Sequence, residues 1–215
     1  MTELTPLAQA LCSLQEDEAL SLIAQMKGAG ASAMDILSQC HQGMTELGRR
    51  FDQGDCFIPE LILAGKIMDK VVSDLEPLLK DAPRPPSAGC VVMGTVQNDI
   101  HNIGKDIVVM MLRGSGYDVV DLGINVPPEK FVQAAQEKNA MLVGMSVLLT
   151  TCYKSVAKTV EAFKAAGLRE KISIMLGGAA ASDRLSNMTG CDYYGRTPVD
   201  AVNHAAAVAR GNMVA

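Results

Sequence analysis

The sequence predicts an α/β protein: an N-terminal four-helix bundle followed by a flavodoxin-like (Rossmann-like) domain with a five-stranded parallel sheet. Three observations lead to this prediction: helical periodicity before residue 80, three prolines close together, and alternating strand-like and helix-like segments after them. Pro83, Pro85 and Pro86 forbid a continuous helix and favour an extended spacer. We therefore place the helical domain at residues 1–82, a linker at 83–89 and the α/β domain at 90–215.

Helical periodicity is clearest in the middle of the first domain. Five apolar residues are spaced three or four positions apart and share one helix face: Leu37, Cys40, Met44, Leu47 and Phe51. A second apolar stripe begins at Leu61, after Pro59, which suits the first turn of a helix. Shorter periodic segments precede both, so an antiparallel bundle of four helices is predicted.

The second domain alternates between two kinds of segment. Apolar runs, which we expect to be strands, lie at 90–96, 117–122, 141–146, 172–176 and 192–194. Helical segments lie between and after them, at 105–113, 129–138, 153–166, 182–188 and 200–210. This alternation predicts a parallel sheet with helices on both faces and the strand order 2-1-3-4-5. In that order a ligand binds beyond the carboxyl ends of strands 1 and 3.

Composition argues against several classes of function. The formal net charge is −5 and the basic residues are scattered, so no nucleic-acid surface is expected. No apolar run approaches the roughly 20 residues that span a bilayer, and the N-terminus lacks a signal peptide, so we expect a cytoplasmic protein without membrane contact. The six cysteines are dispersed, which favours reduced, buried thiols over disulfides or structural zinc.

An Asp and a His stand two residues apart after the first predicted strand. A carboxylate beside an imidazole is the usual way to orient a metal-ligating histidine, because one ring nitrogen binds the metal and the other donates to the carboxylate. Asp99 and His101 therefore predict a metal-containing cofactor, although His101 alone could also be a loop-capping residue. Ser146 and Thr150 follow the third predicted strand and should converge on the same edge, unless they only cap a helix. His204 is expected to face solvent.

Four motifs in order carry a resemblance to a known family: Gly94-Thr95-Val96, Asp99-x-His101-x-x-Gly104, Ser146-x-Leu148-x-Thr150 and Gly177-Gly178. They resemble the cobalamin-binding domain of methionine synthase, B12-dependent mutases and corrinoid methyltransferase proteins. The helical part, with Gly43-Met44 and Phe57-Ile58-Pro59-Glu60-Leu61, is similar to the four-helix cap that precedes methyl-carrying corrinoid domains. The whole chain is most similar to the free-standing corrinoid proteins of methylamine, methanol and O-demethylase systems.

The resemblance implies cobalamin or a related corrinoid bound base-off/His-on, with the cofactor's own base displaced and its nucleotide tail inside the protein. His101 would be the lower axial cobalt ligand and Asp99 its partner. Gly177 and Gly178 would line the tail's channel, where a Cβ could collide with the ligand. The other implied cofactor-binding residues are Gly94, Asn102, Ile103, Gly104, Ser146, Leu148, Thr150, Tyr194 and Gly195. Departures from the family's pattern are Asn98 for a common Gly, Asn102 for a common Asp, and Cys152 for a hydroxyl.

The implied function is that of a corrinoid methyl carrier. Its cobalt would take a methyl group from a substrate-specific methyltransferase and pass it to an acceptor methyltransferase that uses tetrahydrofolate or a thiol; a corrinoid reductive activator is a third implied partner. Because no zinc cluster, nucleophile elbow or phosphate loop is evident, the chain is predicted to be a component rather than a complete enzyme. Methylamines, methanol, glycine betaine and aryl methyl ethers are all candidate donors, since the donor pocket lies on the partner.

Two alternatives use the same fold. A cobalamin-dependent sensor or regulator would also join a helical bundle to this domain. The chain lacks a basic helix-turn-helix extension and any Trp, which argues against it. A receiver-type signalling domain needs an acidic residue at the end of strand 3, where Ser146 stands.

Overall fold

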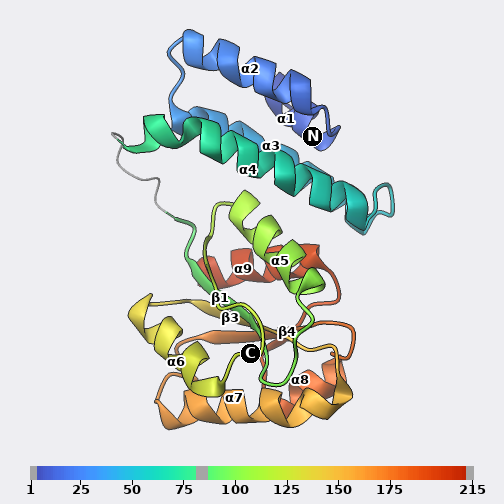
Figure 1. Ribbon diagram of the computed structural model, residues 1–215, viewed down its shortest axis with the longest axis vertical. Helices are drawn as coiled ribbons and strands as arrows, with labels where there is room; N and C mark the ends of the chain where they lie inside the picture. Colours follow the sequence, from blue (N-terminus) through green and yellow to red (C-terminus); the bar gives the residue numbers. More distant parts are fainter. Residues whose placement is uncertain (1–3, 81–86, 212–215) are drawn as a thin grey trace. The chain divides into compact units, whose positions relative to one another are not determined.

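The structure of the chain is a computed structural model that describes residues 4–80 and 87–211 (Figure 1). It divides into two compact units, residues 1–87 with 114–116 and residues 88–113 with 117–215. Most of the linker expected at 83–89 lies outside the described residues, so the three-part boundary scheme stays a prediction.

The helical unit contains the predicted helices: α1 (Pro6–Cys12), α2 (Glu16–Gly28), α3 (Ala33–Asp52) and α4 (Ile58–Lys80). Side-chain oxygens cap the N-termini of two of these helices. Thr5 Oγ1 accepts from the Ala8 N–H in α1, and Ser32 Oγ accepts from the Asp35 N–H in α3. Four members of the predicted stripe on α3 are buried, namely Leu37, Cys40, Met44 and Leu47. The helical N-terminal region is therefore confirmed, and its core is built from the periodicity seen in the sequence.

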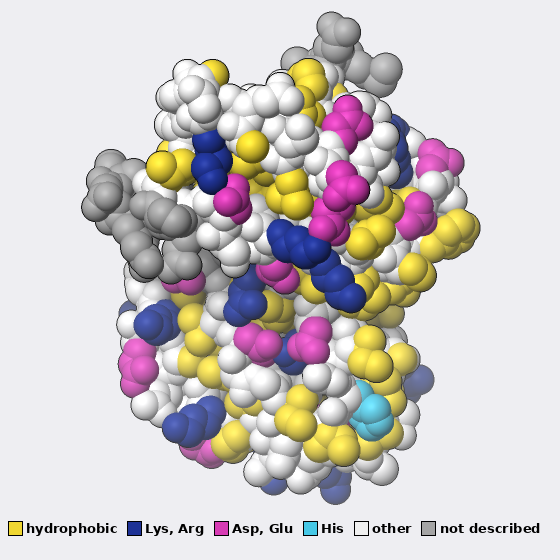
Figure 2. All heavy atoms as spheres, turned by 45° about the horizontal axis from the view of Figure 1, so that its top comes forward, with side chains coloured by type: hydrophobic (Ala, Val, Ile, Leu, Met, Phe, Trp, Pro, Cys, Tyr) yellow, Lys and Arg dark blue, Asp and Glu magenta, His cyan; other side chains and the backbone are white. Residues whose placement is uncertain are grey.

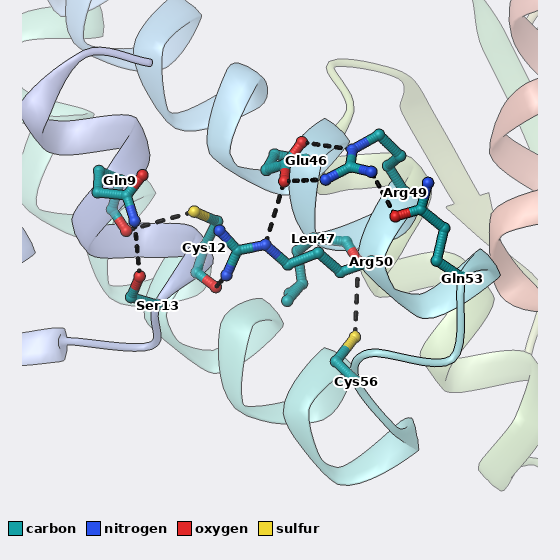
Figure 3. Close-up of polar contacts among 9 residues, drawn as sticks. All are labelled: Gln9, Cys12, Ser13, Glu46, Leu47, Arg49, Arg50, Gln53 and Cys56. Carbon is teal, nitrogen blue, oxygen red and sulfur yellow. Dashed lines mark hydrogen bonds and ion pairs between the residues drawn. The ribbon is translucent and has the colours of Figure 1, made fainter. Parts of the chain in front are cut away.

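Polar contacts tie the ends of these helices together (Figure 3). Arg50 donates from Nε to Glu46 Oε1 over 3.1 Å and from Nη1 to the Cys12 carbonyl, the last residue of α1, over 3.3 Å. The hydrogen bond from Arg49 and then that from Arg50, against the effect of burial, lower the pKa of Glu46 to about 2. The Cys56 thiol contacts the Leu47 carbonyl at 3.6 Å, which holds the turn into α4. Arg50 thus links the C-terminus of α1 to α3.

The second unit is a five-stranded, all-parallel sheet in the order β2-β1-β3-β4-β5, as predicted. The strands are β1 (Cys90–Thr95), β2 (Asp118–Asp121), β3 (Leu142–Ser146), β4 (Ser173–Gly177) and β5 (Tyr193–Tyr194). The helices are α5 (Ile103–Gly114), α6 (Pro128–Glu137), α7 (Tyr153–Ala165), α8 (Asp183–Thr189) and α9 (Pro198–Ala209), and a short 3₁₀ turn, η1 (Thr150–Cys152), precedes α7.

Helices cover both faces of the sheet (Figure 1). Val91 and Met93 of β1 belong to a core shared with α5 and α9, whereas Val92 belongs to a larger core shared with α6, α7 and α8. This split follows from the strand geometry, because successive side chains point to opposite faces. The register aligns Thr95, Ser146 and Gly177 in one row at the carboxyl ends of β1, β3 and β4. That row is the edge at which a ligand is expected.

Two predictions from the composition, scattered basic residues and no membrane-spanning segment, can be compared with the structure. On the face drawn in Figure 2, basic side chains are interspersed with acidic and hydrophobic ones. None of the described helices combines the length and the apolar character needed to cross a bilayer.

His204 does not face solvent, contrary to the expectation from its place in the last helix. Its exposed fraction is 3%, Nε2 lies 2.9 Å from Ser173 Oγ, and its ring stacks on Tyr193 with a centroid distance of 4.1 Å. The phase of α9 turns this residue toward β4 and β5, where a neutral imidazole can bond to a hydroxyl.

Acidification should weaken the fold through His204. Burial lowers the pKa of His204 below its usual 6.5, against a smaller opposing effect of Asp192. As the pH falls, the His204 imidazole binds a proton in the unfolded chain at a higher pH than in the folded protein. The free energy of unfolding therefore decreases as the pH falls below about 6.5. We expect His204→Gln to reduce the slope of the melting temperature between about pH 7 and 5. His41, whose pKa burial also lowers, should account for part of the remaining slope. An unaltered slope in His204→Gln would contradict this assignment.

Candidate functional site

The loop after β1 is shaped by an asparagine in a left-handed conformation. Asn98 has a φ of 72°, and its N–H donates to Asn125 Oδ1 over 2.7 Å. The left-handed region favours glycine and, next, asparagine. Asn98 therefore suits this position, where Gly is expected from the family resemblance described above. The hydroxyl of Thr95, a residue not predicted for the site, donates to the Asp99 carbonyl over 2.5 Å and accepts from the Asn125 N–H over 2.8 Å. These bonds join the loops that follow β1 and β2.

Asp99 orients His101 through two hydrogen bonds. Asp99 Oδ1 accepts from the His101 backbone N–H over 3.0 Å and from the ring Nδ1 over 2.9 Å. An ionised carboxylate can only accept, so Nδ1 carries the hydrogen, and in the neutral imidazole Nε2 keeps its lone pair. The His101 side chain is 44% exposed, whereas that of Asp99 is 1% exposed. The pair therefore presents a single oriented nitrogen ligand at the surface of the sheet unit.

The other oxygen of Asp99 is held by the loop after β3. Asp99 Oδ2 accepts from the N–H groups of Leu148 over 2.6 Å and Leu149 over 3.2 Å. Burial by itself raises the pKa of Asp99, but the N–H groups of Leu148, His101 and Leu149 and the His101 ring outweigh it, and the net pKa lies below its usual value. Asp99 is thus ionised near neutral pH. It joins the loops at the carboxyl ends of β1 and β3, beyond which a ligand is expected.

Removing this carboxylate should destabilise the protein even without a ligand. Asp99→Ala leaves partly buried N–H donors of two loops without the buried carboxylate that they share, and an unsatisfied group typically costs roughly 1–3 kcal/mol. We expect a loss of about 2–4 kcal/mol in the free energy of unfolding, measured by denaturant titration of the unliganded protein. A variant as stable as the wild type would show that water replaces the carboxylate without cost.

The carboxyl edge of the sheet carries exposed apolar side chains, which we call the apolar rim. It consists of large hydrophobic side chains that are between 38% and 75% exposed in the loops after β1, β2 and β3 and at the first residue of α5: Ile100, Ile103, Ile124, Leu148 and Leu149. Exposed hydrophobic groups that gather in one region often mark a binding surface. Ile103 and Leu148 were predicted from the sequence, whereas Ile100, Ile124 and Leu149 were not. The sequence feature that could have identified these three residues is only that each stands in a loop at the carboxyl edge of the sheet.

Small residues line the adjoining strand ends. Ser146 and Gly177 are half-buried neighbours in the register, and Gly195, just after β5, donates its N–H to the Leu176 carbonyl over 3.0 Å. A Cβ on Gly177 would meet only the Gly195 carbonyl at 3.4 Å, an ordinary contact. Tyr194 is half-buried and packs against the core of the α6–α7 face. The edge beside the rim is therefore lined by small residues at the ends of β3 and β4 and just after β5.

Two of the predicted site glycines have structural reasons of their own. Gly178 has a φ of 105°, and a Cβ there would lie 2.3 Å from the Val147 carbonyl oxygen. Gly94 is buried, and its Cβ would lie 2.9 Å from the Phe131 ring. A Cβ at Gly178 would therefore collide with the chain that continues β3, whether or not a ligand is bound. By contrast, a Cβ on Gly104 would meet nothing within 4 Å.

The remaining predicted residues lie around the same edge. Thr150 is exposed at the start of η1, and Asn102 donates from Nδ2 to Asp106 Oδ2 over 2.9 Å at the start of α5. Cys152, which stands where the family usually has a hydroxyl, is buried, with Sγ 4.0 Å from Thr151 Oγ1. Asp99 Oδ2 instead accepts from two main-chain N–H groups.

These residues fit a large cofactor that brings a metal with it. One neutral imidazole nitrogen supplies a single ligand, which suits a metal whose other ligands belong to a macrocycle. The apolar rim suits the broad face of such a ring, and the row of small residues suits an attached chain. Fold and site together define a domain that binds a large metal-bearing cofactor at the carboxyl edge of a parallel sheet.

Comparison with known proteins gives the family. Models of the B12 binding domain match residues 89–203 and, separately, residues 4–76. The dimethylamine corrinoid protein of Methanosarcina barkeri is 35% identical over 202 residues, which cover 94% of this chain and 95% of that protein. The chain belongs to the B12-binding domain family of corrinoid proteins.

Solved structures agree with this assignment. A cobalamin-binding protein from Desulfitobacterium hafniense has a TM-score of 0.80 at 33% identity, and the match covers 97% of this chain and 99% of that one. In the methanol:cobalamin methyltransferase complex from Methanosarcina barkeri, one chain matches with a TM-score of 0.85 at 28% identity, covering 96% of this chain and 79% of that one. The predicted fold and the resemblance to corrinoid proteins are thus confirmed.

Proposed function

We propose that this protein is a corrinoid methyl carrier in a methyltransferase system. The observation that supports it most is the Asp99–His101 pair, which presents one oriented imidazole nitrogen among exposed apolar side chains in a B12-binding domain. When bound, the corrinoid's cobalt supplies the atom that accepts and releases the methyl group. The protein supplies ligation, orientation and shielding from water.

The chain's own residues divide this task. His101 Nε2 would bind the cobalt in place of the cofactor's own base, which is the base-off/His-on arrangement. Asp99, fixed by the loop after β3, keeps the proton on Nδ1 and the ring in place. The apolar rim would hold the ring, and Ser146, Gly177 and Gly195 would hold the nucleotide tail.

The proposal includes partners that act in turn in the cytoplasm. A substrate-specific methyltransferase delivers the methyl group, an acceptor methyltransferase with tetrahydrofolate or a thiol removes it, and a reductive activator restores the cofactor. The similarity to a dimethylamine corrinoid protein and to a chain of a methanol:cobalamin methyltransferase complex supports the first of these partners. A methylated amine is the donor that we propose first, on the basis of the 35% identity to the dimethylamine protein.

Transfer of an isotope-labelled methyl group tests the function. The protein is loaded with hydroxocobalamin, reduced, and incubated with methyltransferases specific for dimethylamine, trimethylamine or methanol and their labelled substrates. We expect one of these enzymes to leave label on the protein-bound cofactor, and His101→Ala to retain far less. A protein that binds the corrinoid tightly but takes label from none of them would instead support the cobalamin-dependent sensor or regulator.

A further inference from the structure

Lys105 is buried at the start of α5, four residues after His101. Its exposed fraction is 2%, although lysine is rarely buried unless it is paired. Nζ donates to both oxygens of Asp121, over 2.7 and 2.6 Å, and to Asp106 Oδ1 over 2.6 Å. Asp121 is the last residue of β2, so this ammonium joins the helix that follows the His101 loop to the neighbouring strand.

Both carboxylates around Lys105 extend toward the site. Asp106 accepts from the side chain of Asn102, the residue directly after His101, over 2.9 Å. Asp121 Oδ1 accepts from the Gly123 N–H over 2.9 Å, and the Gly123 carbonyl in turn accepts from the Thr95 N–H over 3.0 Å. Thr95 completes this chain of hydrogen bonds, because its hydroxyl donates to the carbonyl of Asp99, two residues before His101. Hydrogen bonds from Lys105 therefore reach both sides of His101.

An ionic group is a costly way to obtain stability here. A buried ion pair often contributes no more than well-packed apolar side chains would, because desolvation offsets the attraction. Its distinctive property is direction: three short bonds fix the position of the ammonium, whereas an apolar contact lets the loop shift. A histidine that must meet a metal needs that fixed position, since ligands function only within narrow limits of geometry.

We propose that Lys105, through Asp121 and Asp106, is a positioning residue that holds the His101 loop in the ligating arrangement. This inference rests on the proposed function of His101 as the axial ligand. The Lys105 ammonium bonds to Asp106 and Asp121, so it acts through the loop and not on the cofactor.

Three variants test the proposal by the ligation state of bound hydroxocobalamin, followed by absorbance. Lys105→Met removes the charge and keeps a side chain of similar length. Asp121→Asn keeps the shape of the side chain and removes its charge, and it serves as the test if Lys105→Met does not fold. Both should bind corrinoid, with the equilibrium for histidine ligation weakened by about tenfold or more. The double variant Lys105→Met/Asp121→Leu should regain melting temperature but not ligation. As a matched control, Lys164→Met breaks an exposed pair with Glu161 and should change neither.

The nitrogen NMR signals of the His101 ring in unliganded protein give a second, cofactor-free measurement. Lys105→Met and Asp121→Asn should lower the population with the hydrogen on Nδ1, and Lys164→Met should not. Lower melting temperatures with wild-type ligation and wild-type ring signals would overturn the proposal, as would a double variant that ligates normally. A wild-type protein that fails to bind corrinoid would refute the proposed function, while the ring signals would still decide the role of Lys105.

Discussion

His101→Ala should fold normally and lose the histidine-ligated form of the bound corrinoid. The ring is 44% exposed, so its removal opens no cavity, and Asp99 keeps the N–H groups of Leu148 and Leu149. Loss of a residue that merely supports a metal ligand typically costs roughly 10–100-fold in affinity, and loss of the ligand itself should cost at least as much. Titration with hydroxocobalamin, followed by absorbance, measures both the affinity and the ligation state.

His204→Gln is a suitable control for this titration. His204 contacts Ser173 at the amino end of β4, whereas the candidate site lies at the carboxyl ends of the strands. Its spectrum should match that of the wild type. If His101→Ala and the wild type give the same spectrum with the same affinity, His101 does not bind the cobalt.

Gly178→Leu should destabilise the unliganded protein, whatever its effect on cofactor binding. The φ of 105° is unfavourable for any residue with a Cβ, and the 2.3 Å approach to the Val147 oxygen is to backbone, which cannot rotate away. Backbone strain and overpacking each cost roughly 1–3 kcal/mol, so we expect a loss of at least about 2 kcal/mol in the free energy of unfolding.

Gly177→Ala is the matched control, because its Cβ would make only a 3.4 Å contact. The control should melt close to the wild type. If Gly178→Leu also melts like the wild type and loses only corrinoid binding, the ligand channel, and not the fold, is the reason for the glycine.

The sequence was sufficient for the sheet order and for placing the candidate site residues at one edge of the sheet. Strand and helix periods alternate clearly after residue 90, and parallel strands bring the ends of β1 and β3 together whatever the details of packing. The Asp99–His101 pair could be predicted because its partners are two residues apart and the hydrogen bonds are local.

Features that depend on distant backbone could not be predicted. The bonds from Leu148 and Leu149 to Asp99 join residues 49 and 50 positions apart, and backbone N–H groups leave no mark in a side-chain pattern. The collision that fixes Gly178 depends on the path of the chain after β3. The burial of His204 depends on the rotational phase of a single helix, which one polar residue among alanines does not reveal.

Electron paramagnetic resonance of the cobalt(II) corrinoid bound to this protein tests the central claim most directly, because the splitting reports the nitrogen on the lower side of the cobalt. The protein is labelled with nitrogen-15 in its histidines, and the cofactor is left unlabelled. We predict that the triplet given by an ordinary nitrogen becomes a doublet in the labelled protein, and that His101→Ala abolishes the doublet. A triplet that persists in the labelled protein would show that the cofactor's own base stays on the cobalt, and would contradict the account.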